Sequence, residues 1–248
     1  MTKKKIKKVT TTTTVEYSDI PTEKTHIICI LDRSGSMSSI MDDSIGGFNT
    51  FLKQQKELPD EATITIALFD DKYELIYDNV DIKKAKELTS AEWYPRGMTA
   101  LYDAIGKTIN TEKANFAKLG DNKPNKVLVC IVTDGYENSS REFNVDDIKS
   151  LIKDCEKQDW NFIYLAANQD AFDVGSSFGV SAGNTFTYMA SSAGVNTMNA
   201  KLSNAATSYR SLSTNDVQFA HMSKTLLDDE IDSYTSTTTD GTNKKNKK

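Results

Sequence analysis

Few of the ligands that zinc sites use occur in this chain of 248 residues, which contains only three cysteines and two histidines. The cysteines lie far apart without Cys-x-x-Cys spacing, so no zinc framework can be assembled from them. Cys29 and Cys130 fall within apolar, strand-like runs, and Cys155 falls on an apolar helix face. We therefore expect buried free thiols, with a disulfide between the two strand cysteines as the alternative.

Long apolar segments are also missing. The lysine-rich N-terminus leads through Val9 into a run of five threonines, so we expect neither a signal peptide nor a membrane span. This favours a cytoplasmic protein, although a phage particle or specialised export would give the same pattern. No Gly-x-x-x-x-Gly-Lys string occurs, which makes ATPase activity with a phosphate-binding loop unexpected.

Charge is distributed unevenly along the chain. The formal net charge is −5, yet nine lysines are gathered at the two ends. The body between them is therefore strongly acidic, which disfavours contact with a nucleic-acid backbone and favours cation capture. We expect residues 1–23 to be a basic, threonine-rich flexible tail and residues 213–248 to be a polar, largely disordered tail. Contact of the basic ends with nucleic acid or with an anionic surface is the alternative to solvation.

Strand-like and helix-like patterns alternate between the tails. Short apolar runs predict buried strands, and apolar residues that recur every three to four positions predict helices. The alternation predicts a parallel sheet with helices on both faces, and Asp70-Asp71 predicts a hairpin turn. The expected strands are His26–Leu31, Ala62–Phe69, Tyr73–Tyr77, Lys126–Thr133, Asn161–Ala167 and Asn184–Tyr188. The expected helices are Ser38–Leu58, Thr99–Leu119, Val145–Lys157, a short one after Asn168, and Asn196–Ser211.

The string Asp32-Arg33-Ser34-Gly35-Ser36 directly follows the first apolar strand and places one carboxylate and two hydroxyls on a single turn. Hard oxygen ligands of this kind suit Mg²⁺, Ca²⁺ or Mn²⁺ rather than zinc or copper. Alone they are too few, but Thr99 precedes an expected helix and Asp134 follows another expected strand. Because open parallel sheets bind ligands at the carboxyl ends of their strands, Asp32 and Asp134 are expected to converge.

Helix capping is the alternative role for the hydroxyl residues. Ser34 and Ser36 precede the helix that is expected from Ser38, and Thr99 precedes a helix that begins near Ala100. Serine and threonine are favoured at such N-terminal caps. For Thr99, capping and metal contact can coexist.

The set Asp32, Ser34, Ser36, Thr99 and Asp134 resembles the metal-ion-dependent adhesion site (MIDAS) of von Willebrand factor A (vWA) domains. The resemblance implies a doubly wound, Rossmann-like α/β domain over about residues 24–212, with a mostly parallel sheet and one antiparallel edge strand. It implies a complete site that binds Mg²⁺, or Mn²⁺ or Ca²⁺, and a protein partner whose Asp or Glu completes the coordination. It also implies an adaptor rather than an enzyme, of the intracellular bacterial or phage type.

Residues beside the five ligands are expected to form the rim of the partner surface. The candidates are Arg33, Met37, Met98, Tyr136 and Glu137, with ordinary exposed turn residues as the alternative. The resemblance further implies that partner binding shifts the coordination toward Thr99 and moves the final helix. The alanines and serines of that helix suggest weak packing, which such a movement requires.

Two hydrolase hypotheses compete with the binding hypothesis. Gly179-Val180-Ser181-Ala182-Gly183 matches the Gly-x-Ser-x-Gly string, and Asp216 and His221 follow it in the order of an α/β-hydrolase triad. That string needs a strand before it and a helix after it, whereas here the expected order is reversed. Asp32 could instead attack phosphate, but the residue two positions later is Ser34 rather than an acid. A metal-dependent or serine hydrolase that uses Asp32 or Ser181 is the alternative function.

Overall fold

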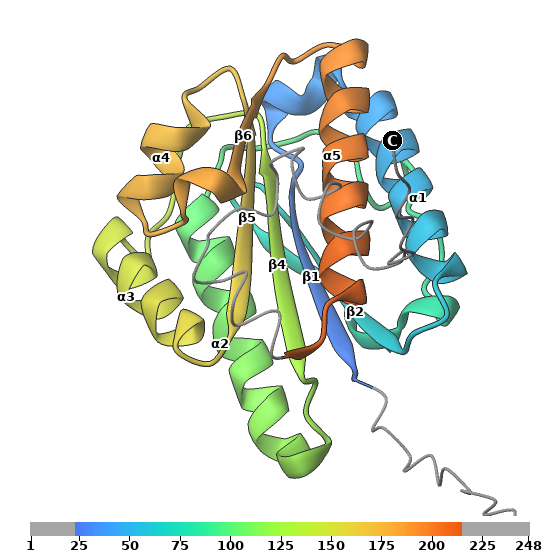
Figure 1. Ribbon diagram of the computed structural model, residues 1–248. Coiled ribbons are helices and arrows are strands. Elements are labelled where there is room, and N and C mark those ends of the chain that lie inside the picture. The colour runs from blue at the N-terminus through green and yellow to red at the C-terminus, as the bar shows by residue number, and fades with distance from the viewer. Residues whose placement is uncertain (1–22, 215–248) are drawn as a thin grey trace, which may run out of the picture.

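A six-stranded sheet lies between two layers of helices in the computed structural model, which describes residues 23–214 (Figure 1). The strands are β1 (Thr25–Asp32), β2 (Ala62–Phe69), β3 (Tyr73–Asp81), β4 (Lys126–Thr133), β5 (Trp160–Ala167) and β6 (Thr185–Tyr188). Their order in the sheet is β3-β2-β1-β4-β5-β6. All neighbouring pairs are parallel except β2 with β3, so β3 is the expected antiparallel edge strand.

Five α-helices cover the two faces of this sheet. They are α1 (Met41–Glu57), α2 (Leu101–Leu119), α3 (Val145–Glu156), α4 (Ala171–Ser177) and α5 (Ser192–Ser211). Figure 1 shows α1 and α5 on one face and α2, α3 and α4 on the other, and a separate apolar cluster lies under each layer. The predicted doubly wound α/β fold is therefore confirmed. No helix within residues 23–214 is both long and apolar enough to cross a membrane.

The central strands explain why the fold could be predicted. All eight residues of β1, β4 and β5 are buried, because helices cover both faces of the parallel sheet. Strands in that environment are near-continuous apolar runs in sequence. Cys29 and Cys130 occupy paired positions on β1 and β4, and the three cysteines are buried free thiols, as expected.

Helix α5 differs from its prediction. It begins at Ser192, four residues before the expected start, and its apolar side chains are buried against the sheet and α1. Tyr209 donates a hydrogen bond of 3.0 Å from its hydroxyl to the carbonyl of Val127 in β4. A Cβ atom at Gly47 of α1 would collide with the side chain of Asn199. The small residues therefore allow close contact between two helices, and the expectation of weak packing was wrong.

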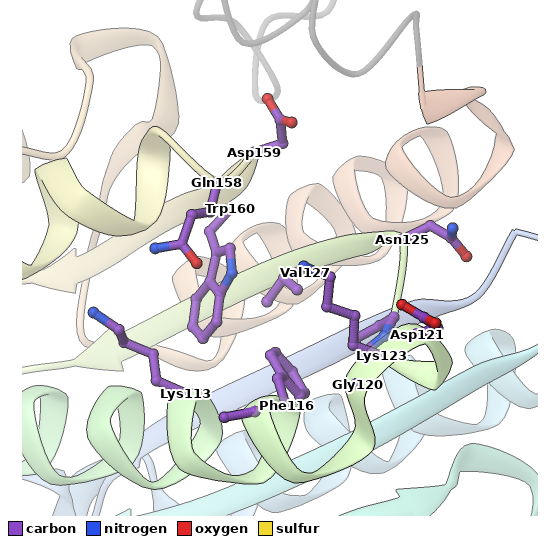
Figure 2. Close-up of a pocket in the computed structure, with 12 residues that line it drawn as sticks. Lys113, Phe116, Gly120, Asp121, Lys123, Asn125, Val127, Gln158, Asp159 and Trp160 are labelled. Atoms are coloured by element: carbon purple, nitrogen blue, oxygen red, sulfur yellow. The ribbon is translucent and has the colours of Figure 1, made fainter.

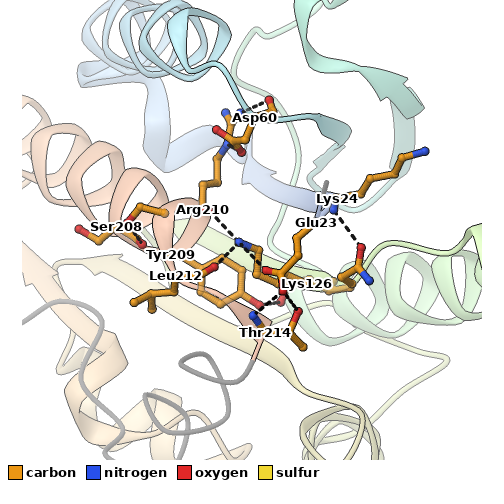
Figure 3. Close-up of polar contacts among 12 residues, drawn as sticks. Glu23, Lys24, Asp60, Lys126, Ser208, Tyr209, Arg210, Leu212 and Thr214 are labelled. Atoms are coloured by element: carbon orange, nitrogen blue, oxygen red, sulfur yellow. Dashed lines mark hydrogen bonds and ion pairs between the residues drawn. The ribbon is translucent and has the colours of Figure 1, made fainter. Parts of the chain in front are cut away.

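A buried lysine holds the two ends of the described chain together at the amino end of the sheet (Figure 3). Lys126 Nζ donates to the carbonyl of Arg210 over 2.7 Å and to that of Leu212 over 2.6 Å, so it satisfies the end of α5. Lys126 also pairs with Glu23 at 3.7 Å, and Glu23 accepts hydrogen bonds from the backbone and hydroxyl of Thr214. The segments that enter and leave the domain therefore lie side by side.

Candidate metal site

The two acidic residues of the predicted site lie at neighbouring strand ends. Asp32 closes β1 and Asp134 follows β4, which is the direct neighbour of β1 in the sheet. The backbone carbonyl of Asp32 accepts a hydrogen bond of 2.9 Å from the indole of buried Trp93. The carboxylates approach each other because parallel strands end at the same edge of the sheet, as the sequence predicted.

Hydrogen bonds connect four of the five predicted residues. The hydroxyls of Ser34 and Ser36 share a hydrogen bond of 3.0 Å, and Ser36 donates to Asp134 Oδ1 over 2.6 Å. Asp32 Oδ1 accepts the backbone N–H of Ser34 over 2.6 Å, and Asp32 Oδ2 accepts the hydroxyl of Thr133 over 2.5 Å. These bonds fix the orientation of both carboxylates and of the two serine hydroxyls.

Thr99, from the loop before α2, also lies beside Gly135 and Ser36. Its backbone N–H donates to Asn138 Oδ1 over 2.9 Å, and its carbonyl accepts the N–H of Asn138 over 3.0 Å. A Cβ atom added to Gly135 would lie 3.3 Å from both Ser36 Oγ and Thr99 Oγ1. The two hydroxyls therefore flank Gly135, where a larger residue would intrude between them.

None of the three hydroxyls caps a helix. Ser34 is the cap position of a short 3₁₀ helix, Gly35–Ser39, but its side chain makes no capping bond. Ile40 and Ala100 stand at the cap positions of α1 and α2, and neither helix has a side-chain cap. The capping alternative is thus wrong. The hydroxyl of Ser34 bonds to Ser36, that of Ser36 bonds to Asp134, and that of Thr99 lies beside Gly135.

The acidic groups of this site are held in an unfavourable environment for negative charge. Burial raises the pKa of Asp32 to about 6, although hydrogen bonds from Thr133 and Ser34 act in the opposite direction. Burial also raises the pKa of Asp134. Asp134 Oδ2 is buried and accepts no hydrogen bond within the described chain. A buried carboxylate oxygen without a donor is costly, and a bound cation would satisfy it.

Asp70 supports the site from β2, and the sequence analysis missed this role. Its side chain is fully buried and forms ion pairs with Arg96 and, at 3.5 Å, with Arg33. Its backbone carbonyl accepts the N–H of Ala100 over 2.9 Å, immediately after Thr99. Asp70 thus holds the loop that carries Thr99. The signal was present, because Asp70 also follows the carboxyl end of a strand beside β1.

The expected rim is only partly correct. Met98 and Tyr136 are exposed, at 53% and 59%, whereas Arg33 and Met37 are almost fully buried. Arg33 turns inward to Asp70 and Glu74, and the side chain of Met37 joins the apolar core. Glu137 is partly buried and accepts hydrogen bonds from three backbone N–H groups of Tyr102, Ser139 and Ser140. Other exposed apolar side chains are Tyr94 in the loop before α2, Phe172 in the first turn of α4, and Met189 directly after β6.

Other candidate chemistry is poorly placed. Ser181 lies between α4 and a short 3₁₀ helix that leads into β6, so the strand–turn–helix context of a nucleophile elbow is absent there. Asp216 and His221 lie outside the described residues. Within residues 23–214, no group of three or more His, Cys, Asp or Glu side chains could hold a metal ion. The candidate site therefore depends on combining two carboxylates with hydroxyls.

Comparisons with known proteins identify the fold. No protein-family model matches the sequence, and no curated protein matches it. A structure of proximal thread matrix protein 1 from the mussel byssus, with a zinc-occupied MIDAS motif, is similar with a TM-score of 0.52 and 13% identity over 74% of this chain and 48% of that one. A von Willebrand factor type A protein from Catenulispora acidiphila gives 0.53 and 13%, over 73% and 42%.

A minor pilin, PilB from Streptococcus sanguinis, gives a TM-score of 0.55 with 10% identity, over 80% of this chain and 63% of that one. This chain spans less than half the length of the mussel and Catenulispora proteins. The arrangement of strands and helices in residues 23–214 is that of a vWA domain.

Proposed function

We propose that the chain binds one divalent cation through Asp32, Ser34, Ser36, Thr99 and Asp134 and presents it to an acidic side chain of a protein partner. The observation that carries this proposal is the buried Asp134 Oδ2, which lacks a donor and lies beside convergent hydroxyl groups. Two desolvated carboxylates and three hydroxyls that cap no helix form a donor set suited to a cation.

Mg²⁺ is the expected ion, with Mn²⁺ or Ca²⁺ as alternatives, because all five donors are hard oxygens. Because the MIDAS motif of the mussel protein holds zinc, binding of Zn²⁺ should be measured beside that of Mg²⁺. When bound, the ion supplies an electrophilic position for an incoming carboxylate. The residues of this chain orient the donors: Thr133 and the Ser34 amide hold Asp32, Ser36 holds Asp134, and Asp70 holds the Thr99 loop.

A protein partner is favoured by the surface near the site. Five of the six large apolar side chains that are markedly exposed lie on segments at the carboxyl side of the parallel strands. Tyr136, Phe172 and Met189 follow β4, β5 and β6, and Tyr94 and Met98 lie in the loop whose backbone bonds to Arg33 and Gly35 beside the site. Exposed apolar groups gathered in one region often mark protein interaction sites. The net negative charge of the chain between its basic ends disfavours nucleic acid as the partner. We therefore propose that the protein is an adaptor that binds another protein and catalyses no reaction. Three free cysteines support a cytoplasmic location within this proposal.

Thermal unfolding with added metal tests the cation site. A cation at about 100 times its dissociation constant stabilises a folded protein by about 2.7 kcal/mol. In a domain of this size that corresponds to a rise in melting temperature of about 5–10 °C. Wild type should show this rise with Mg²⁺ or Mn²⁺, and Asp32→Ala and Asp134→Asn should not. Asp121→Asn, on the exposed loop after α2, is the control and should respond like wild type. Equal responses of all variants would refute the site.

The partner proposal has a separate test. Proteins captured by the tagged chain in Mg²⁺ should be compared with those captured in chelator and by Thr99→Ala. A partner that fits the proposal is lost in both comparisons, and it loses affinity again when one of its own Asp or Glu residues is changed to the amide. A partner that binds equally well in chelator would contradict the proposed mode of partner binding. The proposal of a cation site would not be affected by that result.

A further inference from the structure

A cleft of about 680 Å³ opens at the amino end of the sheet, at the opposite ends of the strands from the candidate metal site (Figure 2). It lies between the last turns of α2, the segment that leads into β4, and the turn before β5. Cavities of this size commonly hold small organic ligands. Neither the cation nor its proposed partner uses this cleft.

Three buried apolar side chains form the floor of the cleft. Phe116 and Trp160 pack with their ring centroids 5.4 Å apart and an interplanar angle of 60°, and Val127 lies beside them. The indole N–H of Trp160 donates no hydrogen bond to any residue that the structure describes, although the residue as a whole is only 4% exposed. Trp160 therefore offers an apolar surface and an unused donor at the floor.

Two lysines line the walls. Figure 2 shows Lys113 and Lys123 on opposite sides of the cleft. Within residues 23–214, neither ammonium group forms a close ion pair or a hydrogen bond, although Lys113 is near enough to help lower the pKa of the exposed Asp154. Lys126, by contrast, is buried and forms two hydrogen bonds and an ion pair. The carboxylate of Asp159 points away from the cleft in Figure 2, so it does not neutralise the lysines there.

We propose that this cleft binds a small organic anion that consists of a flat apolar body and a single acidic group. The apolar body would cover Phe116, Trp160 and Val127, where its burial removes apolar surface from water. The acidic group would lie between Lys113 and Lys123, where hydrogen bonds are strengthened by charge. The amides of Gln158 and Asn125 add neutral polar contacts at the edge.

The same surroundings exclude more highly charged ligands. Asp121 also lines the cleft, and the protein as a whole is acidic. A polyanion such as a nucleic-acid strand would meet this negative charge along its length, whereas one acidic group can contact the lysines alone. A ligand with one charge and one ring is therefore the best match.

A fluorescent aromatic sulfonate, 1-anilinonaphthalene-8-sulfonate, is a suitable probe because it has the proposed chemistry. We expect the full-length wild type to bind one probe molecule per chain, with energy transfer from Trp160. The double variant Lys113→Glu/Lys123→Glu should bind at least about tenfold more weakly. Lys118→Glu, a single substitution of the same kind on α2 outside the cleft, should bind like wild type. Matching melting temperatures would show that the variants remain folded.

Competition separates the proposal from simpler explanations. The carboxylate 1-naphthoate should displace the probe, and neutral 1-naphthalenemethanol and inorganic sulfate should not. Displacement by the neutral compound would indicate an apolar patch only, and displacement by sulfate would indicate an anion site only; either result overturns the proposal. So would equal binding to wild type and the double variant. The metal response of the double variant should be unchanged, so the two proposals can fail separately.

Discussion

Asp70 shows how a residue that is not a proposed ligand can control one. It is fully buried between Arg33 and Arg96, and Arg96 lies in the loop that carries Thr99, so loss of the carboxylate affects that loop. Removing one partner of a buried ion pair is costly because the other charge stays buried.

We predict that Asp70→Asn lowers the free energy of unfolding by about 3 kcal/mol. It should also weaken metal binding, because the ion pair that holds Arg96, in the same loop as Thr99, would be lost. Calorimetric titration of the folded variant with Mn²⁺ measures the second effect. Asp121→Asn, at an exposed position far from this loop, is the control and should change neither quantity. Unchanged metal affinity in Asp70→Asn would show that the loop does not depend on this carboxylate.

Asp103 gives a prediction about pH. This carboxylate accepts the backbone N–H groups of Arg141, Glu142 and Phe143 over 2.9–3.0 Å. Burial raises the pKa of Asp103, but the three hydrogen bonds outweigh burial and leave the pKa below its usual range. The stabilisation is therefore present above the unfolded pKa near 3.8 and is lost as the pH falls through the lowered folded pKa.

Denaturant unfolding of wild type and Asp103→Asn at several pH values tests this. At pH 7 the variant should be less stable by about 2 kcal/mol, since the amide accepts these bonds less well than the charged carboxylate. The difference should disappear in acid, once Asp103 is protonated in both states. A difference that stays constant down to the acid transition would show that the charge of Asp103 does not matter.

Residues at strand ends were predictable, whereas neighbouring side-chain directions were not. Asp32 and Asp134 follow apolar runs, and topology alone brings such positions together. The burial of Arg33 and Met37 depends on Asp70, Glu74 and the core beneath the turn, which lie far away in sequence. No local pattern distinguishes an exposed arginine from one that pairs with a distant carboxylate.

Helices α1 and α5 meet through small residues, and two adjacent glycines in α1 test that contact. Gly46 faces open space, because no atom lies within 4 Å of an added Cβ. Gly47 faces the side chain of Asn199, which donates a hydrogen bond of 3.0 Å to the carbonyl of Val195. The same substitution should therefore have opposite effects at the two positions.

We predict that Gly46→Ala stabilises the protein by about 0.5–1 kcal/mol, since alanine restricts the unfolded chain and favours the helix. Gly47→Ala should destabilise it by about 1 kcal/mol or more, because Asn199 must move. Chemical denaturation of both variants gives the comparison. Equal stabilisation by both changes would mean that α1 and α5 are less closely packed than the structure shows.

The final helix, α5, buries its apolar side chains against the sheet, so we expect folding to require it. Its buried side chains include Met198, Leu202 and Tyr209. Ending the chain after Asn196 should abolish cooperative thermal unfolding, because the face of the sheet beneath α5 would be exposed. A chain that ends at Thr214 keeps these contacts and should unfold cooperatively. Cooperative unfolding of the shorter chain would restore the expectation of weak packing.

Element boundaries were predictable where the sequence pattern was strong. The bounds of β2 and β4 match, but β3 continues to Asp81 instead of ending at Tyr77. Its last part contains Asp78 and Asn79, with Asn79 at a φ of 49°, and its pairing with β2 is irregular there. Polar residues and a local distortion hide such a strand, because the alternation of apolar residues is lost.

At the scale of the whole molecule, the binding proposal predicts no catalysis. Purified protein with Mg²⁺ or Mn²⁺ should hydrolyse neither p-nitrophenyl acetate nor p-nitrophenyl phosphate above background. Ser181→Ala and Asp32→Asn identify the origin of any activity. Turnover that is lost in either variant would favour the hydrolase alternative, and turnover that survives both would come from a contaminant.

The contact between Glu23, Lys126 and Thr214 has a practical consequence. Both ends of the described chain leave the sheet at the amino end of β4, whereas Asp32 and Asp134 lie about 25 Å away at the other end of strands eight residues long. Attachment of a chain trimmed to residues 23–214 to a sensor surface or a fusion partner through either end would therefore turn the candidate metal site outward. Two copies joined in tandem by a long linker could engage two acidic groups at once, so tethered formats would measure avidity unless the density on the surface is kept low.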